Sequence, residues 1–178
     1  PSTRSYFPSM EARASAMAVR SAQAENAPPE FLSHAARAYR KLAGVSKAPA
    51  PHYLRAIELC QQALGRWADA AEARYELCRA RIDFAGFLSN SGAWEGAASQ
   101  IEEALPVAQA NADEEATNLR WNENLATACA LNGRIQKQLG HGAAAQKSLE
   151  AALAIRERMS RQRPADVELR HQLLASHV

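Results

Sequence analysis

Apolar residues recur every three or four positions along most of the chain, in runs separated by short polar, proline-containing or glycine-containing breaks. This spacing places the apolar side chains on one face of a helix, so each run is predicted to be an amphipathic helix. The first helix is predicted over about Met10 to Ala24. It ends before Asn26 to Pro29, because two successive prolines cannot continue a helix.

The helical runs repeat along the chain. A shift of 48 positions superimposes residues of the same type or size: Leu77 on Leu125 and Leu173, Phe87 on Ile135, Gly92 on Gly140, Ala97 on Ala145, and Ile101 on Leu149. An earlier copy, offset by 41 or 42 positions, aligns Ala56 with Ala97 and Cys60 with Ile101. Repetition of this kind is typical of arrays in which identical units stack and bury each other's apolar faces.

Each repeat is predicted to be a helical hairpin with Gly92 or Gly140 in its turn, because glycine adopts the left-handed backbone that often ends a helix. Residues 1–29 form an N-terminal tail and flanking helix, and residues 30–178 form the array. The hairpins cover about 30–70, 71–112 and 113–163, and residues 164–178 are a truncated half-repeat. A terminal repeat normally needs a cap, so this truncation indicates a longer parent protein.

Small residues are expected where the two helices of a hairpin approach closely, at Ala97 and Ala145. Larger residues are expected to fill the rest of that contact: Ile101, Leu105, Leu149 and Leu153. Pro106 lies inside the second helix of hairpin two, where we expect a kink or a short break.

Composition strengthens the helical prediction. The 178 residues include 40 Ala and 17 Leu, against 5 Val, 5 Ile and 3 Thr, so residues that favour strands are scarce. Hydrophobic residues make up 47% and charged residues 22%, which is typical of a globular rather than a disordered chain. The fold class is therefore predicted to be all-α.

Charge and cysteine content narrow the function classes. The 21 basic and 19 acidic side chains give a net charge of only +2, so no overall attraction to nucleic acid or membrane is expected. Cys60, Cys78 and Cys129 are far apart and lie in apolar patterns, which indicates buried free thiols. Reduced thiols weakly favour a cytoplasmic location, whereas a membrane anchor upstream in the parent chain would place this segment outside.

Several positions resemble the tetratricopeptide repeat family. Its small, glycine, alanine and proline positions correspond here to Ala85, Gly92, Ala97, Ala104-Leu105, Gly133, Gly140, Ala145, Ala152-Leu153 and Pro164. Hairpin three is similar to a longer bacterial subtype, through Trp121, Leu125 to Gly133, Leu153 to Arg158 and Pro164 to Asp166. Asn132, Gln136 and the long period depart from the usual pattern.

The resemblance implies a right-handed superhelical solenoid of antiparallel hairpins that binds a protein, a peptide or a partner helix in a concave groove. Arrays of this kind are often appended to bacterial Ser/Thr kinases and other signalling proteins. An alternative is therefore a regulatory or sensory segment that contacts other domains of a longer parent chain. No kinase residues are present in the sequence.

The first helix of each hairpin is implied to line that groove. Its inward positions carry these residues: Arg37, Arg40, Lys47, Arg79, Asp83, Ser89, Asn90, Thr127, Arg134, Lys137 and Gln138. The set is net basic, and guanidinium groups bind carboxylates through paired charge-assisted hydrogen bonds. We therefore expect an acidic peptide ligand. The alternative is that these residues form ordinary solvated helix faces.

Catalysis and cofactor binding are not expected. The sequence has no nucleophile elbow, Walker loop or kinase signature, and its five histidines lack ligand spacing, so we assign no metal and no cofactor. Gly140 to Ala145 matches a dinucleotide fingerprint in letters, but it follows a helix instead of a strand. The arginines at 156, 158, 161 and 163 have no aromatic stacking partners, so nucleic-acid binding is not expected either.

Overall fold

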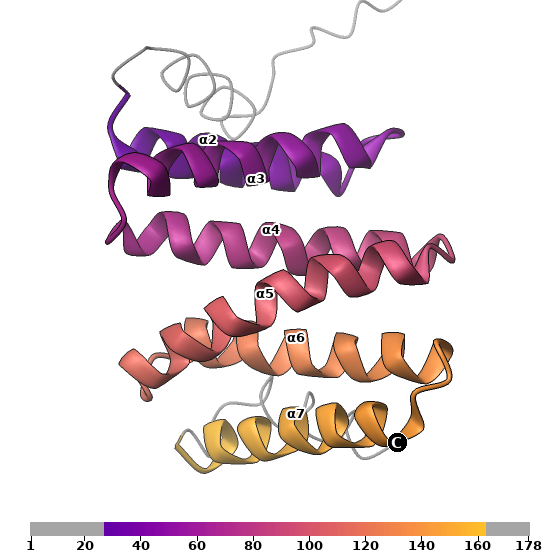
Figure 1. Ribbon diagram of the computed structural model, residues 1–178. Coiled ribbons are helices and arrows are strands. Elements are labelled where there is room, and N and C mark those ends of the chain that lie inside the picture. Colours follow the sequence, from indigo (N-terminus) through magenta and orange to yellow (C-terminus); the bar gives the residue numbers. More distant parts are fainter. Residues whose placement is uncertain (1–26, 163–178) are drawn as a thin grey trace, which may run out of the picture. The chain divides into compact units, whose positions relative to one another are not determined.

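The computed structural model describes residues 27–162, where every regular element is a helix and no strand is present (Figure 1). The helices in this range are α2 (Pro29–Ala43), α3 (Pro49–Arg66), α4 (Ala71–Asn90), α5 (Trp94–Glu114), α6 (Leu119–Gln138) and α7 (Gly142–Gln162). The all-α prediction is confirmed for these residues. The helix predicted over Met10 to Ala24, the tail before it and the half-repeat over 164–178 lie outside the described range.

The chain divides into two compact units, and the boundary falls inside α4. Unit 1 ends at Ala80 and contains α2, α3 and the first half of α4. Unit 2 begins at Arg81 and contains the second half of α4 together with α5, α6 and α7.

In unit 1, α2 packs against α3. A proline begins each of these helices, where its missing N–H is not needed and its fixed φ suits a helix. Because only five residues connect the two packed helices, they run antiparallel. Leu32, Leu59 and Cys60 are at most 2% exposed and form the centre of the contact.

In unit 2, α6 packs against both α5 and α7. Ile101, Ile135 and Met159 supply the large buried side chains of these helices. The Asn118 side chain caps the start of α6 by accepting a hydrogen bond from the Arg120 backbone N–H. The contact between α6 and α7 holds together hairpin three, the longest of the repeats predicted from the sequence.

The turns predicted at Gly92 and Gly140 are confirmed. Both glycines have φ of 82°, the left-handed region that other residues avoid. After α4, the Ala93 N–H bonds the Leu88 carbonyl and the Gly92 N–H bonds the Ser89 carbonyl. His141 and Gly140 make the same two bonds after α6, so a Schellman turn recurs at the same place in both repeats.

The predicted close approach of small residues is also found, with one correction. Ala97 and Ala145 are buried, as is Ile101. Leu149 touches α6 at Gly133, yet it is 46% exposed and so fills its contact only in part. The leucine occupies the space that a side chain at position 133 would need.

Helix α5 continues through Pro106 without a break. Its ribbon changes direction about halfway along its length, in agreement with the kink expected of an internal proline (Figure 1). None of the helices between residues 27 and 162 is long and apolar enough to cross a membrane.

Candidate functional site

The eleven groove residues predicted from the sequence are distributed over both units. Unit 1 holds four of them: Arg37, Arg40, Lys47 and Arg79. Unit 2 holds the other seven: Asp83, Ser89, Asn90, Thr127, Arg134, Lys137 and Gln138.

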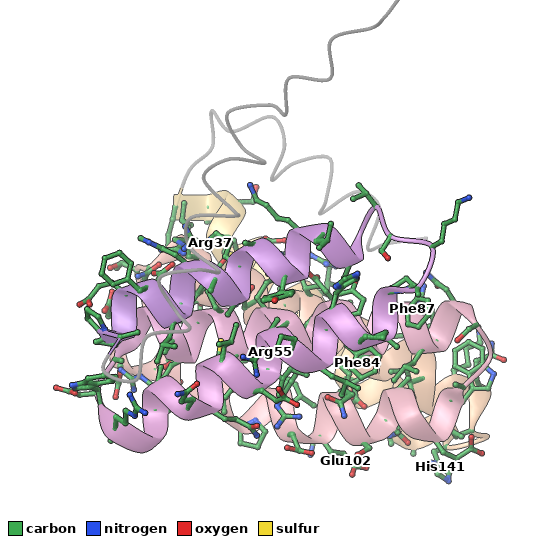
Figure 2. The ribbon with its side chains drawn as sticks, turned by 90° about the horizontal axis from the view of Figure 1, so that it is seen from above. Arg37, Arg55, Phe84, Phe87, Glu102 and His141 are labelled. Carbon is green, nitrogen blue, oxygen red and sulfur yellow. The ribbon has the colours of Figure 1, made fainter. Side chains whose placement is uncertain are left out.

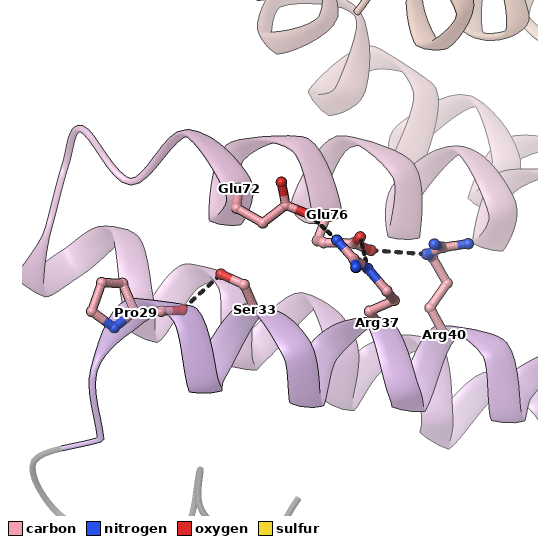
Figure 3. A network of polar contacts seen from close by, with 6 residues as sticks. All are labelled: Pro29, Ser33, Arg37, Arg40, Glu72 and Glu76. Carbon is pink, nitrogen blue, oxygen red and sulfur yellow. Dashed lines mark hydrogen bonds and ion pairs between the residues drawn. The ribbon is translucent and has the colours of Figure 1, made fainter. Parts of the chain in front are cut away.

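In unit 1, Arg37 and Arg40 of α2 bind two glutamates of α4 (Figure 3). The Arg37 Nη2 group pairs with Glu72, and its Nε donates to Glu76 Oε1 at 2.5 Å. The Arg40 Nε donates to Glu76 Oε2 at 3.2 Å. Both oxygens of Glu76 therefore accept from arginines, and its side chain is only 1% exposed.

Helical spacing explains this cluster. Arg37 and Arg40 are three residues apart on α2, and Glu72 and Glu76 are four apart on α4, so each pair shares one helix face. The two glutamates were not predicted from the sequence. A signal was available, because the two acidic residues have helical spacing on the helix that was predicted to lie next to the two arginines. Together the four side chains balance two positive charges with two negative ones.

Ser33 supports the start of the same helix. Its hydroxyl donates to the Pro29 carbonyl at 2.7 Å, one turn earlier (Figure 3). This bond satisfies a buried hydroxyl inside α2. Of the remaining predicted residues of unit 1, Lys47 is exposed in the connection between α2 and α3, and Arg79 is half-buried on α4.

Arg81 of unit 2 is a second internally paired cation. Its side chain is 8% exposed, and its Nη2 lies 2.5 Å from Glu103 Oε2 of α5. Its Nη1 also donates to Gln100 Oε1 at 3.0 Å. Arg81 thus ties α4 to α5, in the way that Arg37 and Arg40 tie α2 to α4.

Arg134 of α6 has a different environment. Its Nη2 donates to the Ser89 hydroxyl at 2.6 Å and approaches Asn90 Oδ1 at 3.4 Å, both at the end of α4. The Ser89 hydroxyl donates in turn to the Gly86 carbonyl at 2.9 Å and is itself buried. Between residues 27 and 162, no carboxylate pairs with Arg134, which is exposed.

Lys137 lies one helical turn beyond Arg134 on the same face of α6 and is also exposed. Its ammonium group pairs with no carboxylate in the described part of the chain. We call Ser89, Asn90, Arg134 and Lys137 the Arg134 surface. Thr127 lies about two helical turns before Arg134 on α6, and its hydroxyl donates to Glu123 Oε1 at 3.4 Å. The half-buried Asp83 lies on α4.

Other side chains that the sequence singled out have surface or packing positions. Glu102 and Glu150, which recur at the same repeat position, are both exposed, and Figure 2 labels Glu102 and the exposed His141. Phe84 and Phe87 of α4 have rings 6.4 Å apart and nearly parallel (Figure 2). No group of three or more potential metal ligands occurs among residues 27–162.

Burial suppresses the chemistry of the cysteines. All three are buried, and none of them forms a disulfide within the described part of the chain. Burial raises the pKa of Cys60 to about 12, and the Glu76 carboxylate adds to the rise, whereas Arg40 opposes it. Burial also raises the pKa of Cys129, against a smaller opposing effect of Arg156. Neither thiol is a candidate nucleophile, because the thiolate is the reactive form.

We therefore expect Cys60 to resist alkylation in the folded protein. At pH 8, iodoacetamide should modify it about a thousandfold more slowly than in urea, because the raised pKa removes the thiolate and burial blocks access. Peptide mass spectrometry of samples quenched over time measures the rate at each cysteine. Equal rates for Cys60 in the folded and unfolded protein would contradict its burial beside Glu76.

Comparisons with protein families, with curated proteins and with solved structures find no match to this chain.

Proposed function

We propose that this chain is a non-catalytic interaction module that binds an acidic protein segment at the Arg134 surface. One observation carries the proposal: Arg134 is held in place by a buried serine hydroxyl and has no carboxylate partner among residues 27–162. Arg37, Arg40 and Arg81 are instead committed to glutamates of their own unit. The basic ligand-binding surface is thus smaller than the groove inferred from the sequence.

The geometry of Arg134 suits carboxylate recognition. A guanidinium group has five N–H donors in a rigid plane, and residues 27–162 engage only Nη2 of Arg134. The remaining donors can bind both oxygens of a carboxylate at once. Because Ser89 already orients the side chain, less conformational entropy is lost when a ligand binds.

Lys137 and Asn90 extend the surface in two directions. Lys137 adds a second positive charge one turn away, which favours a segment with successive acidic residues over a single carboxylate. The Asn90 amide group supplies N–H donors for the backbone carbonyls of an extended peptide. This combination favours a peptide ligand over a free inorganic anion.

We further propose that the hairpins are of the tetratricopeptide type and build a right-handed superhelical solenoid, with the Arg134 surface on its concave side. The sequence repeat and the recurrence of one turn geometry at Gly92 and Gly140 support this proposal. A regulatory role within a longer signalling protein stays a prediction of the same resemblance.

Selection from a random peptide library tests the binding proposal. We expect the wild-type chain to enrich peptides with successive Asp or Glu residues. The double variant Arg134→Glu and Lys137→Glu should lose at least about tenfold in affinity for them, since each charge reversal replaces attraction by repulsion. Fluorescence anisotropy of a labelled selected peptide measures this loss.

The matched control reverses two cations of α7, as Lys147→Glu and Arg161→Glu, which changes the net charge of the protein by the same amount. The control should keep the wild-type affinity. If both variants lost the same affinity for the peptide, the loss would be an effect of net charge alone. Equal affinity in all three proteins would exclude the Arg134 surface as the binding site.

A further inference from the structure

Helix α2 has an apolar stripe that its two described neighbours leave half uncovered. Phe31, Ala35, Ala38 and Leu42 follow the spacing of a single helix face, and Val45 continues it into the next connection. Phe31 is 44% exposed, Leu42 45% and Val45 83%, whereas the two alanines between them are buried. These five residues are called the α2 stripe below.

Among residues 27–162, the exposed residues of the α2 stripe take no part in the polar and ring contacts of the helix. Arg37 and Arg40 point towards α4, to which they are ion-paired. The ring of Tyr39 stacks on His52 of α3, with ring centroids 6.3 Å apart. Two faces of α2 are therefore occupied inside unit 1, and the stripe is a third face of apolar character.

We propose that the α2 stripe is the docking surface for the segment Met10–Ala24 of the same chain, bound as a helix antiparallel to α2. The first argument is length and position. The sequence predicts a helix of about 15 residues there, and α2 itself has 15 residues, so the two would span about the same 22 Å. Residues 25–28 leave a connection of ordinary length for packed antiparallel helices.

The second argument is complementarity of the two stripes. The segment has a face at the same spacing as the α2 stripe, made of Met10, Ala14, Met17 and Ala24 with the polar Ser21 between them. When the chain folds back at the proline pair, these residues meet the α2 stripe in reverse order. In three of the five pairs a large side chain then faces a small one: Ala24 opposite Phe31, Met17 opposite Ala38, and Ala14 opposite Leu42.

Covalent connection favours this occupant over a second copy of the chain. A tethered segment has an effective concentration in the millimolar range near its site, which a second copy at micromolar concentration cannot match. The segment also contributes two methionines, whose flexible side chains fill irregular spaces beside alanines. Unit 1 would then bury its third apolar face without an external partner.

Disulfide trapping in the full chain tests the docking. The variant with Ala14→Cys and Leu42→Cys should form an intrachain disulfide under mild oxidation, because these positions face each other in the predicted register. The matched control has Ala16→Cys with Leu42→Cys, which moves the first thiol to the opposite side of the predicted helix. The control should form the disulfide at least about tenfold more slowly. The native cysteines are buried and do not compete.

A second measurement avoids the paired substitutions. In the single variant Leu42→Cys, maleimide labelling should become roughly tenfold faster when Met17→Asp is added, because a charge on the segment's apolar face releases it from the stripe. Equal trapping in the two cysteine pairs, or a labelling rate that Met17→Asp leaves unchanged, would overturn the proposal. Disulfide-linked dimers in place of the intrachain product would assign the α2 stripe to a second copy and equally overturn it.

Discussion

Replacing Arg37 and Arg40 together by Met should lower the free energy of unfolding by about 3–5 kcal/mol, because it leaves the Glu76 carboxylate buried without a counter-charge. Glu76 is 1% exposed and both of its oxygens accept from these two arginines. Arg37 is itself 35% exposed, so part of its interaction is weakened by solvent, whereas Arg40 is 16% exposed. Urea unfolding followed by circular dichroism measures the change.

Two further variants separate the loss of an ion pair from the loss of packing. Adding Glu76→Leu to the double variant should restore most of the stability, since removing all charges of a buried cluster costs far less than removing one side of it. Arg55→Met, which breaks the exposed pair with Glu58, should change stability by less than about 1 kcal/mol. Wild-type stability in the double arginine variant would contradict the role assigned to the cluster.

Substituting Gly133 by Ala should destabilise the protein by about 1–2 kcal/mol, although alanine is the better helix former. A Cβ at this position would lie 2.6 Å from Leu149 Cγ, 2.8 Å from its Cδ2 and 3.1 Å from the Ala145 carbonyl oxygen. Helices α6 and α7 would have to separate or Leu149 would have to move. The same unfolding experiment measures the effect.

Gly86→Ala is the matched control for this prediction. Gly86 also lies inside a helix, but a Cβ there would have no heavy atom within 4 Å, so the substitution should stabilise the protein by about 0.5–1 kcal/mol. Leu149→Ala combined with Gly133→Ala should recover most of the loss, because it removes the two closest atoms. If Gly133→Ala proves as favourable as Gly86→Ala, the close approach of α6 and α7 is wrong.

The helices and turns were predictable because their causes are local. Apolar spacing specifies each helix, and only glycine adopts the backbone needed at Gly92 and Gly140 without strain. The burial of Ala97 and Ala145 was also predictable, since two helices can approach closely only where the side chains are small. Local rules thus account for the order of helices and for the residues at their closest contacts.

The partners of the basic residues were not predictable in the same way. Arg37 and Arg134 were both predicted to line one groove, yet one meets glutamates and the other a serine. The difference depends on which level of the neighbouring helix lies opposite each arginine, and helical spacing within one segment does not contain that information. Leu149 shows the same limit, because its closest contact, Gly133, lies in a different helix.

Within residues 27–162, some cations of the predicted groove pair with glutamates and others do not, and this difference changes what the net positive charge of the groove residues implies. Arginines paired with buried glutamate stabilise the fold, and their substitution affects stability before it affects binding. Exposed cations without a carboxylate partner can bind a ligand without first breaking an internal pair. Charge reversal at Arg37 and Arg40 would therefore affect folding and binding together. Charge reversal at Arg134 and Lys137 allows the effect on binding to be measured separately from the effect on folding.

The most direct test of the account follows individual arginines during ligand binding. Side-chain Nε–H resonances of the 15N-labelled protein are assigned by single Arg→Lys variants and recorded while a peptide of six glutamates is added. We predict that the Arg134 signal shifts in a saturable manner while those of Arg37 and Arg40 stay in place. Shifts at Arg37 and Arg40 with none at Arg134 would contradict the division between structural and ligand-binding cations.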